Sequence, residues 1–202
     1  MSQAKILTQS EFRKILLHIA KKKHHARNKA ILYCSFFGCM RVGEIASLTI
    51  SDVLSEDGSI KEEVYLKPFQ TKGSRGRTVY FPTKLQDEIK NYLSVRFGLK
   101  DKDLRVLNLT DTSKALFGSQ KNTQRGFSPN TLCQWFTKLY ADCSINGASS
   151  HSGRRWGATQ LCEQSVNPKI IQKILGHRQL QTTMLYYEVS PKSMRNAVEL
   201  LS

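Results

Sequence analysis

Acidic residues are scarce in this sequence. Its 202 residues include 16 Asp and Glu but 31 Lys and Arg, which gives a formal net charge of +15 at pH 7. Asp52, Glu56 and Asp57 come close together, but their spacing indicates a solvated loop. The sequence therefore offers no carboxylate cluster suited to two-metal catalysis.

Several other motifs are missing. No apolar run approaches the roughly 18 residues that a membrane-spanning helix needs, and the first residues lack the apolar core of a signal peptide. We therefore expect a cytoplasmic protein. The five cysteines include no C-x-x-C pair, so we expect reduced, mostly buried thiols rather than a zinc site. The absence of a glycine-rich phosphate loop argues against nucleotide hydrolysis.

The excess of positive charge indicates a polyanionic partner. Lys and Arg side chains that neutralise phosphates release counterions, and this release drives binding to nucleic acid. A merely basic, soluble surface is the alternative that charge alone leaves open.

Apolar residues recur at helical spacing in the first quarter of the chain. Thr8 and Glu11 form a capping-box pattern ahead of the first helix. A second helix is expected from about Ala26 to Phe37, and Gly38 is expected to end it. A further short helix is expected over residues 41–48.

The hydrophobic period changes in the middle of the chain. Runs 63–66 and 78–81 are rich in β-branched and aromatic residues, and they flank a polar, glycine-containing turn over residues 71–76. We expect a β-hairpin or a small three-stranded sheet here. Thr83 and Gln86 are then expected to start another amphipathic helix.

Residues 98–127 are the least regular part of the sequence, where we expect a surface loop with a short strand near Leu104–Leu109. Later helices are expected where a capping residue precedes a proline at the first helical position, namely Ser128-Pro129, Asn167-Pro168 and Ser190-Pro191. These elements predict an α+β fold, mainly helical with a small antiparallel sheet, over a single domain of residues 1–202.

Six basic or phenolic residues could serve one reaction together. In chain order they are Arg41, Lys72, His151, Arg154, His177 and Tyr186. Arg41 begins Arg-Val-Gly-Glu, Lys72 precedes a glycine, and His151 and Arg154 form an H-x-x-R pair. Tyr186 comes nine residues after Leu-Gly-His177. This pattern resembles the catalytic set of the tyrosine recombinases, also called phage-type integrases.

The resemblance covers nearly the whole chain, from Leu7 to about Ser190. Ser152-Gly153 stand between the histidine and the arginine, where the family often has Asp-Leu, and Arg155 stands where a histidine is common. These neighbours are not the catalytic groups, so we expect them to alter packing and specificity more than activity.

The resemblance implies that Tyr186 attacks a DNA phosphate, forms a 3′-phosphotyrosyl link and releases a 5′-hydroxyl. Tyr187 is the competing nucleophile. Adjacent helical residues point about 100° apart, so both cannot face one phosphate. The family spacing after His177 selects Tyr186, and an ordinary packed tyrosine is the alternative interpretation.

The other five residues would surround the same phosphate. Arg41 and Arg154 would hold its non-bridging oxygens through planar, permanently charged guanidinium groups. His151 and His177 would donate hydrogen bonds or assist proton transfer. Lys72 would protonate the leaving oxygen from its turn.

Neighbouring residues have supporting or competing roles in this interpretation. Lys67 is the rival of Lys72 as the general acid. Glu44 lies one helical turn after Arg41 and would orient it. Arg75 and Arg77 are interpreted as contacts to DNA phosphates or a groove.

These residues imply a site-specific recombinase or integrase that acts on double-stranded DNA without metal, ATP or another cofactor. The phosphotyrosyl link conserves the energy of the broken phosphodiester, so a hydroxyl of another strand can attack it. The resemblance also implies a homotetramer on two DNA sites. A type IB topoisomerase-like relaxation of DNA and a non-catalytic DNA-binding protein that retains the fold are the alternatives.

Typical family members carry an N-terminal helical DNA-binding domain ahead of this region. The present sequence starts seven residues before Thr8, its first capping residue. The resemblance therefore implies either a catalytic domain without that N-terminal core-binding domain or a member of a minimal subclass resembling fimbrial-switch invertases. The segment Pro191–Leu200 is expected to dock on a neighbouring subunit or to cap its own core.

Overall fold

The computed structural model describes residues 4–100, 103–118, 126–187, 195 and 198–199. The chain divides into two compact units, Met1–Gly157 and Ala158–Ser202, and each is described by itself. Within the described residues the fold is mainly helical with a two-stranded antiparallel sheet, which confirms the predicted fold class.

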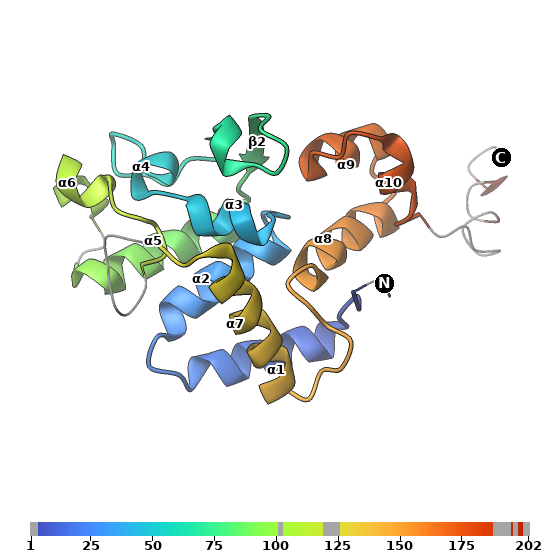
Figure 1. Ribbon diagram of the computed structural model, residues 1–202, viewed down its shortest axis with the longest axis horizontal. Coiled ribbons are helices and arrows are strands. Elements are labelled where there is room, and N and C mark those ends of the chain that lie inside the picture. The colour runs from blue at the N-terminus through green and yellow to red at the C-terminus, as the bar shows by residue number, and fades with distance from the viewer. Residues whose placement is uncertain (1–3, 101–102, 119–125, 188–194, 196–197, 200–202) are drawn as a thin grey trace. The chain divides into compact units, whose positions relative to one another are not determined.

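The first unit contains most of the secondary structure (Figure 1). Its elements in chain order are α1 (Gln9–Ala20), α2 (His25–Phe36), α3 (Val42–Ser47), α4 (Ile50–Val53), β1 (Glu63–Leu66), η1 (Pro68–Gln70), β2 (Arg77–Tyr80), α5 (Thr83–Phe97), η2 (Leu104–Val106), α6 (Leu109–Thr112), α7 (Pro129–Asp142) and the start of α8 (Ser152–Glu163). The second unit contains the rest of α8, α9 (Pro168–Leu175) and α10 (Leu180–Met184).

Helix α2 is the central element of the first unit. It packs against α1, α3 and α5, and nearly all of its residues from Ala30 onward are buried. At its C-terminal end the rings of Phe12, Phe36 and Trp156 form a cluster, with centroids 4.8 to 5.7 Å apart. This packing joins α1, α2 and α8 at Trp156, two residues after Arg154.

The predicted ends of the first helices are largely confirmed. Thr8 and Glu11 make the reciprocal hydrogen bonds of a capping box ahead of α1. Helix α2 ends at Phe36, as expected near Gly38, but the left-handed residue that turns the chain is Cys39, with φ of 49°. The turn at Cys39 places Arg41 directly ahead of α3, which matches the short helix expected there.

The predicted hairpin is present as β1 and β2. Val64 pairs with Val79 and Leu66 with Arg77; β1 buries alternate side chains, and β2 buries Val79. The connection between them contains η1 and a polar turn in which Gly73 and Ser74 have positive φ. The predicted Lys72 turn therefore lies at the end of a defined hairpin, where its side chain is exposed.

Helix α5 begins at Thr83, as predicted, with Pro82 as its N-cap residue. One other prediction is wrong. The expected strand near Leu104–Leu109 is instead the 3-10 helix η2 followed by α6, capped by side chains of Asp103 and Asn108. Short polar side chains that bond the nearby backbone favour such turns over a strand.

The acidic stretch from Asp52 is also more ordered than expected. Asp52 lies in α4 and forms a capping box with Thr49, and its carboxylate accepts a hydrogen bond from Gln70 Nε2 at 2.9 Å. This contact ties α4 to η1, at the base of the hairpin connection. Asp52 is therefore a structural carboxylate rather than a solvated one.

Two of the three capping residues followed by proline start helices as predicted. Ser128 caps α7 and Asn167 caps α9 through their side chains. Ile171 is buried on α9, whereas its neighbour Ile170 is exposed. The third pair, Ser190-Pro191, and most of the segment expected after it lie outside the described residues.

Helix α8 approaches α2 so closely that glycine is required at the contact. A Cβ atom added at Gly153 would lie 2.4 Å from Ser35 Oγ and 2.5 Å from Phe36 Cδ2. At Gly43 in α3, a Cβ atom would meet nothing within 4 Å. Gly153 therefore lets the helix that carries Arg154 lie against α2.

Gly153→Ala is expected to destabilise the protein by about 1–3 kcal/mol through overpacking. Gly43→Ala is expected to be neutral or to stabilise by up to about 1 kcal/mol, because alanine is the better helix former. Urea denaturation of the two variants checks the difference. Equal midpoints for both would contradict the close approach of α8 to α2.

The described residues include five free cysteines, of which Cys34, Cys39 and Cys143 are buried. Burial raises the pKa of the Cys39 thiol to about 11. No described helix is long and apolar enough to cross a membrane. The described part of the chain also has no group of three His, Cys, Asp or Glu side chains arranged to hold a metal ion.

Candidate active site

Arg41 is held at the start of α3 by Glu44. The Arg41 backbone N–H donates to Glu44 Oε2 at 2.7 Å, and its guanidinium Nη1 donates to Oε1 at 3.0 Å. The orientation of Arg41 by Glu44, predicted from their one-turn spacing, is therefore confirmed as a contact. It restricts a long side chain, 25% exposed, to one region of the surface.

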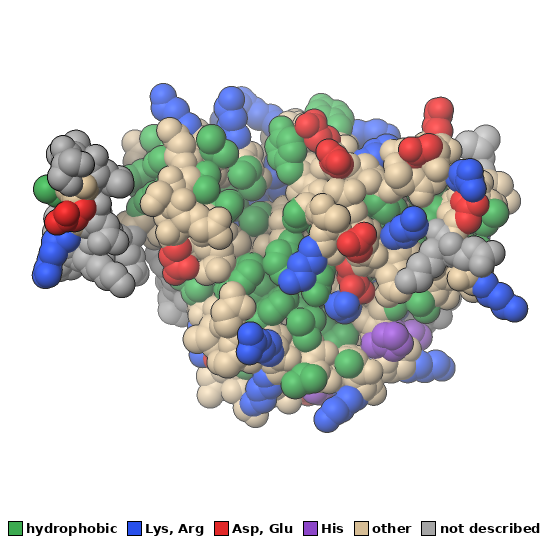
Figure 2. Space-filling view, turned by 180° about the vertical axis from the view of Figure 1, so that it is seen from behind, with side chains coloured by type: hydrophobic (Ala, Val, Ile, Leu, Met, Phe, Trp, Pro, Cys, Tyr) green, Lys and Arg blue, Asp and Glu red, His purple; other side chains and the backbone are tan. Residues whose placement is uncertain are grey.

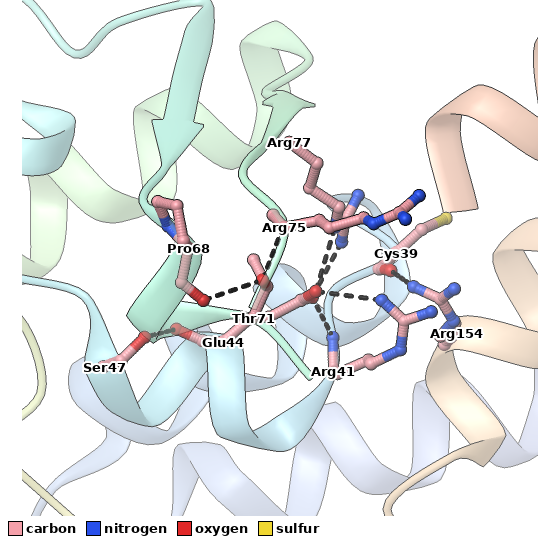
Figure 3. Close-up of polar contacts among 9 residues, drawn as sticks. All are labelled: Cys39, Arg41, Glu44, Ser47, Pro68, Thr71, Arg75, Arg77 and Arg154. Atoms are coloured by element: carbon pink, nitrogen blue, oxygen red, sulfur yellow. Dashed lines mark hydrogen bonds and ion pairs between the residues drawn. The ribbon is translucent and has the colours of Figure 1, made fainter. Parts of the chain in front are cut away.

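Glu44 also binds a second arginine that the sequence interpretation placed on DNA (Figure 3). Arg77 Nε donates to Glu44 Oε1 at 2.9 Å, and Arg77 Nη2 donates to Oε2 at 2.7 Å. Only 1% of the Glu44 side chain and 11% of the Arg77 side chain are exposed. The prediction that Arg77 contacts DNA directly therefore misses its main interaction. This interaction is a buried, bidentate salt bridge with Glu44, which joins β2 to α3.

The cations around Glu44 set its charge state. Burial alone would raise the pKa of Glu44, but the hydrogen bonds and charge of Arg77, followed by those of Arg41, lower the pKa below its usual value. The carboxylate is therefore ionised at neutral pH. An ionised, fully bonded carboxylate is suited to positioning arginines and not to accepting a proton.

Arg154 lies in the first turn of α8 and is buried, with 5% of the residue exposed. Its Nη1 donates to the backbone carbonyl of Cys39 at 2.6 Å, so it contacts the turn that precedes Arg41. Burial, and then the charges of Arg41 and Arg77, lower the pKa of Arg154 to about 10. The guanidinium stays charged at neutral pH, and its proximity to other cations favours an anionic ligand.

His151 precedes α8, and Lys72 is exposed on the hairpin turn. The pKa of His151 is lowered first by partial burial of its ring and then by the charges of Arg154, Arg41 and Lys72. The imidazole is therefore neutral at pH 7, although the residue as a whole is exposed. The electrostatic influence of three separate cations on one ring indicates that these four residues lie near one another.

The structure also separates Lys72 from its rival. The Lys67 ammonium lies over the ring of Phe69, 6.0 Å from the centroid. Among the described residues, Lys72 has no aromatic contact of this kind. Its positive charge instead contributes to the lowered pKa of His151. This difference favours Lys72 over Lys67 as the lysine nearer to His151.

The second unit carries the remaining two predicted residues. Gly176 ends α9 in the left-handed conformation, with φ of 59°, so the chain turns and His177 leaves the helix, as predicted. His177 Nδ1 is 3.0 Å from Thr183 Oγ1 on α10. The ring of Tyr186, just after α10, stacks with the His177 ring at a centroid distance of 6.2 Å.

The adjacent tyrosine has a different environment. The Tyr187 hydroxyl donates to the backbone carbonyl of Val166. Partial burial, followed by interaction with Cys162, raises the pKa of Tyr187. Tyr187 is therefore a packing residue within the second unit, whereas Tyr186 lies beside the histidine of the Leu-Gly-His motif.

Four of the six predicted residues thus gather in the first unit, and two lie side by side in the second. Sequence reasoning missed the pairing of Arg77 with Glu44. No local sequence signal could have shown it, because the two residues are 33 positions apart. Arg155, which follows Arg154, donates a hydrogen bond to the Ala4 carbonyl.

Comparisons with known proteins identify the family of the chain. The sequence profile of the phage integrase family matches residues 5–193. Tyrosine recombinase XerA of Pyrococcus furiosus is 32% identical over 196 residues, which are 96% of this chain and 61% of that protein. Tyrosine recombinase XerD of Rickettsia conorii is 25% identical over 197 residues, 96% of this chain and 62% of that protein. The chain therefore belongs to the phage integrase family, the tyrosine recombinases, and spans about three fifths of the length of these relatives.

Solved structures show the same fold. A crystal structure of XerA recombinase matches with a TM-score of 0.72 at 21% identity, and covers 99% of this chain and 66% of that chain. The Tn1549 transposon integrase in complex with circular intermediate DNA matches with a TM-score of 0.72 at 19% identity, and covers 100% of this chain and 68% of that chain.

Proposed function

We propose that this chain is the catalytic domain of a site-specific recombinase or integrase that cleaves and rejoins double-stranded DNA through a phosphotyrosyl intermediate. The observation that carries the proposal is the cation cluster in the first unit. Arg41 and Arg154 come from segments more than a hundred residues apart, yet both are fixed at the Cys39 turn. Such a cluster of arginines suits the non-bridging oxygens of one phosphate.

The proposed reaction begins when the Tyr186 phenol attacks the phosphorus of a phosphodiester. The phenolic proton passes to solvent, the bond between phosphorus and the 5′-oxygen breaks as Lys72 protonates that oxygen, and a 3′-phosphotyrosyl bond forms. A free phenol has a pKa near about 10, so it is a weak nucleophile at neutral pH unless cations stabilise the developing charge. Arg41, Arg154 and neutral His151 would supply charge and hydrogen bonds at the phosphate, and His177 would assist at the phenol.

Rejoining reverses these bonds. A 5′-hydroxyl attacks the phosphotyrosyl phosphorus, the phenol regains its proton, and a phosphodiester forms without an external energy source. A hydroxyl from a second duplex gives strand exchange. The family resemblance supports a homotetramer on two DNA sites for this step.

The proposal is tested with nicked duplexes whose sequence is randomised around the nick. Loss of the short product strand prevents rejoining, so the covalent protein–DNA adduct accumulates and withstands denaturant. We expect such an adduct, and we expect addition of a second duplex with a free 5′-hydroxyl to yield a joined product. Relaxation of supercoiled DNA without joining to a second duplex would indicate the topoisomerase-like activity instead. Binding without any adduct would reduce the protein to a DNA-binding member of the family.

Lys72→Ala is expected to slow cleavage by about 10²–10⁴-fold, because the leaving 5′-oxygen would lose its proton donor. A substrate with sulfur in place of that oxygen should restore most of the lost rate, since a thiolate leaves without protonation. Single-turnover cleavage of both substrates measures this. Lys67→Ala is the matched control and should cleave both at nearly the wild-type rate. Rescue by sulfur in Lys67→Ala alone would transfer the role to Lys67.

A further inference from the structure

A second basic surface lies at the turn between α1 and α2, where α7 packs beside it. It is a hollow of about 330 Å³ in the first unit. Figure 2 shows histidine side chains grouped in this region, with Lys and Arg side chains beside them. The hollow is separate from the residues of the candidate active site, none of which line it.

Cations dominate the rim of this hollow. Lys22 and Lys23 lie on the α1–α2 turn, Lys138 lies on α7, and all three side chains are exposed. Asp142 is the one acid among the lining residues, and its carboxylate is already paired with His18 Nε2 at 3.5 Å. The rim therefore carries an excess of positive charge that its own carboxylate does not neutralise.

The wall of the hollow holds a positive charge in a fixed position. Arg27 Nη1 donates to the Gly118 carbonyl at 3.2 Å, and its guanidinium lies over the Phe127 ring, 4.9 Å from the centroid. Arg27 Nε is buried and has no hydrogen-bond partner among the described residues. Burial lowers the pKa of Arg27, and burial with the charges of Arg27 and Lys23 lowers the pKa of His24. The positive charges of Arg27 and Lys23 at this wall would stabilise a bound anion.

The floor of the same hollow is apolar. Ile19 and Leu139 are buried there, and the indole of Trp135 is partly exposed. An apolar floor with a cationic rim matches a nucleic-acid backbone, in which phosphates alternate with sugars that have apolar faces. Phosphate contacts by lysine side chains strengthen binding without reading the sequence.

The hollow and the candidate active site lie at opposite ends of α2. His24 and Arg27 stand at the N-terminal end of the helix, whereas Arg41 follows its C-terminal end. A helix of 12 residues is about 18 Å long, so one phosphate cannot contact both sites. Any anion bound in the hollow is therefore an additional contact.

We propose that this hollow is a second DNA-backbone contact, which binds phosphates away from the phosphate that is cleaved. The inference rests on DNA as the partner in the proposed function, but it does not require the cleavage chemistry. Lys22 on the α1–α2 turn and Lys138 on α7 provide the phosphate contacts at its rim.

The test compares two variants with the same loss of charge. Lys22→Gln with Lys138→Gln removes one lysine from the α1–α2 turn and one from α7, and Lys90→Gln with Lys100→Gln removes two exposed lysines elsewhere in the first unit. Binding to a long intact duplex of arbitrary sequence is measured over a range of salt concentrations. Each lost phosphate contact lowers the slope of log K against log salt by about 0.9, so the hollow variant should lose roughly two units of slope and the control almost none.

Equal slopes and affinities for the two variants would overturn the second contact while leaving the proposed active site untouched. A wild-type protein that does not bind duplex DNA would overturn both proposals. The adduct assay with a short nicked duplex separates the sites further. The hollow variant should still form the covalent adduct once the duplex is saturating, because all six proposed active-site residues are retained.

Discussion

Tyr186→Phe is expected to abolish the covalent adduct with nicked DNA, whereas Tyr187→Phe is expected to retain it. Phenylalanine keeps the ring that stacks on His177 but lacks the oxygen that would bond to phosphorus. The loss should exceed about a thousandfold, because no other group replaces the nucleophile within the same step. Gel separation under denaturing conditions measures the adduct, and mass spectrometry of the wild-type adduct locates the modified tyrosine.

The two tyrosine variants also differ in what else they change. Tyr187→Phe removes the hydrogen bond to the Val166 carbonyl, so it should lower stability by about 1 kcal/mol without affecting formation of the covalent adduct. Tyr186→Phe should bind intact duplex with wild-type affinity. A Tyr186→Phe protein that still forms the adduct, together with a Tyr187→Phe protein that does not, would move the nucleophile to Tyr187.

Glu44→Gln is expected to destabilise the protein by about 3–5 kcal/mol, which is typical when one partner of a buried ion pair is removed. Glutamine would leave the buried Arg77 without a counter-charge and would lose the paired geometry that fixes Arg41. Urea denaturation measures the stability. Cleavage by the folded variant should fall as well, since Arg41 would no longer be held in place.

Glu88→Gln is the matched control for this change. Glu88 is also a buried carboxylate, but its partner is the half-exposed Lys29, at 2.5 Å, rather than two arginines of the candidate site. Glu88→Gln should lower the free energy of unfolding by less than Glu44→Gln does, and it should leave the rate of adduct formation unchanged. Equal losses of cleavage in both variants would show that Glu44 contributes only to folding.

The lowered pKa of Glu44 predicts how the stability difference between wild type and Glu44→Gln depends on pH. The contribution of Glu44 to stability is fully present above the pKa of the unfolded chain, near 4.5, and is lost as the pH falls through the lower pKa of the folded protein. The stability gap between wild type and Glu44→Gln should therefore be constant near neutral pH. It should narrow only below about pH 4.5.

Local sequence signals predicted the elements whose stability depends on near neighbours. The capping residues Thr8, Ser128 and Asn167 start helices where expected, because each side chain bonds a backbone N–H within three residues. The hairpin was predicted from two β-rich runs around a glycine turn. The strand predicted near Leu104 was wrong because the side chains of Asp103 and Asn108 bond the nearby backbone. These hydrogen bonds favour helical turns despite the apolar pattern.

The amino-acid sequence by itself determined the chemical types available to this protein and their order: an excess of cations, six basic or phenolic residues at family spacing, and the helices that carry them. Only the tertiary structure decided which charges meet. Nothing in the sequence pairs Arg77 with Glu44, or Arg154 with the Cys39 carbonyl, because those partners are separated by 33 and 115 residues. The same holds for the hollow at the α1–α2 turn, whose lining residues come together through the packing of distant helices. Interactions between such distant residues depend on how the chain is packed in space, and no local pattern of residues encodes them.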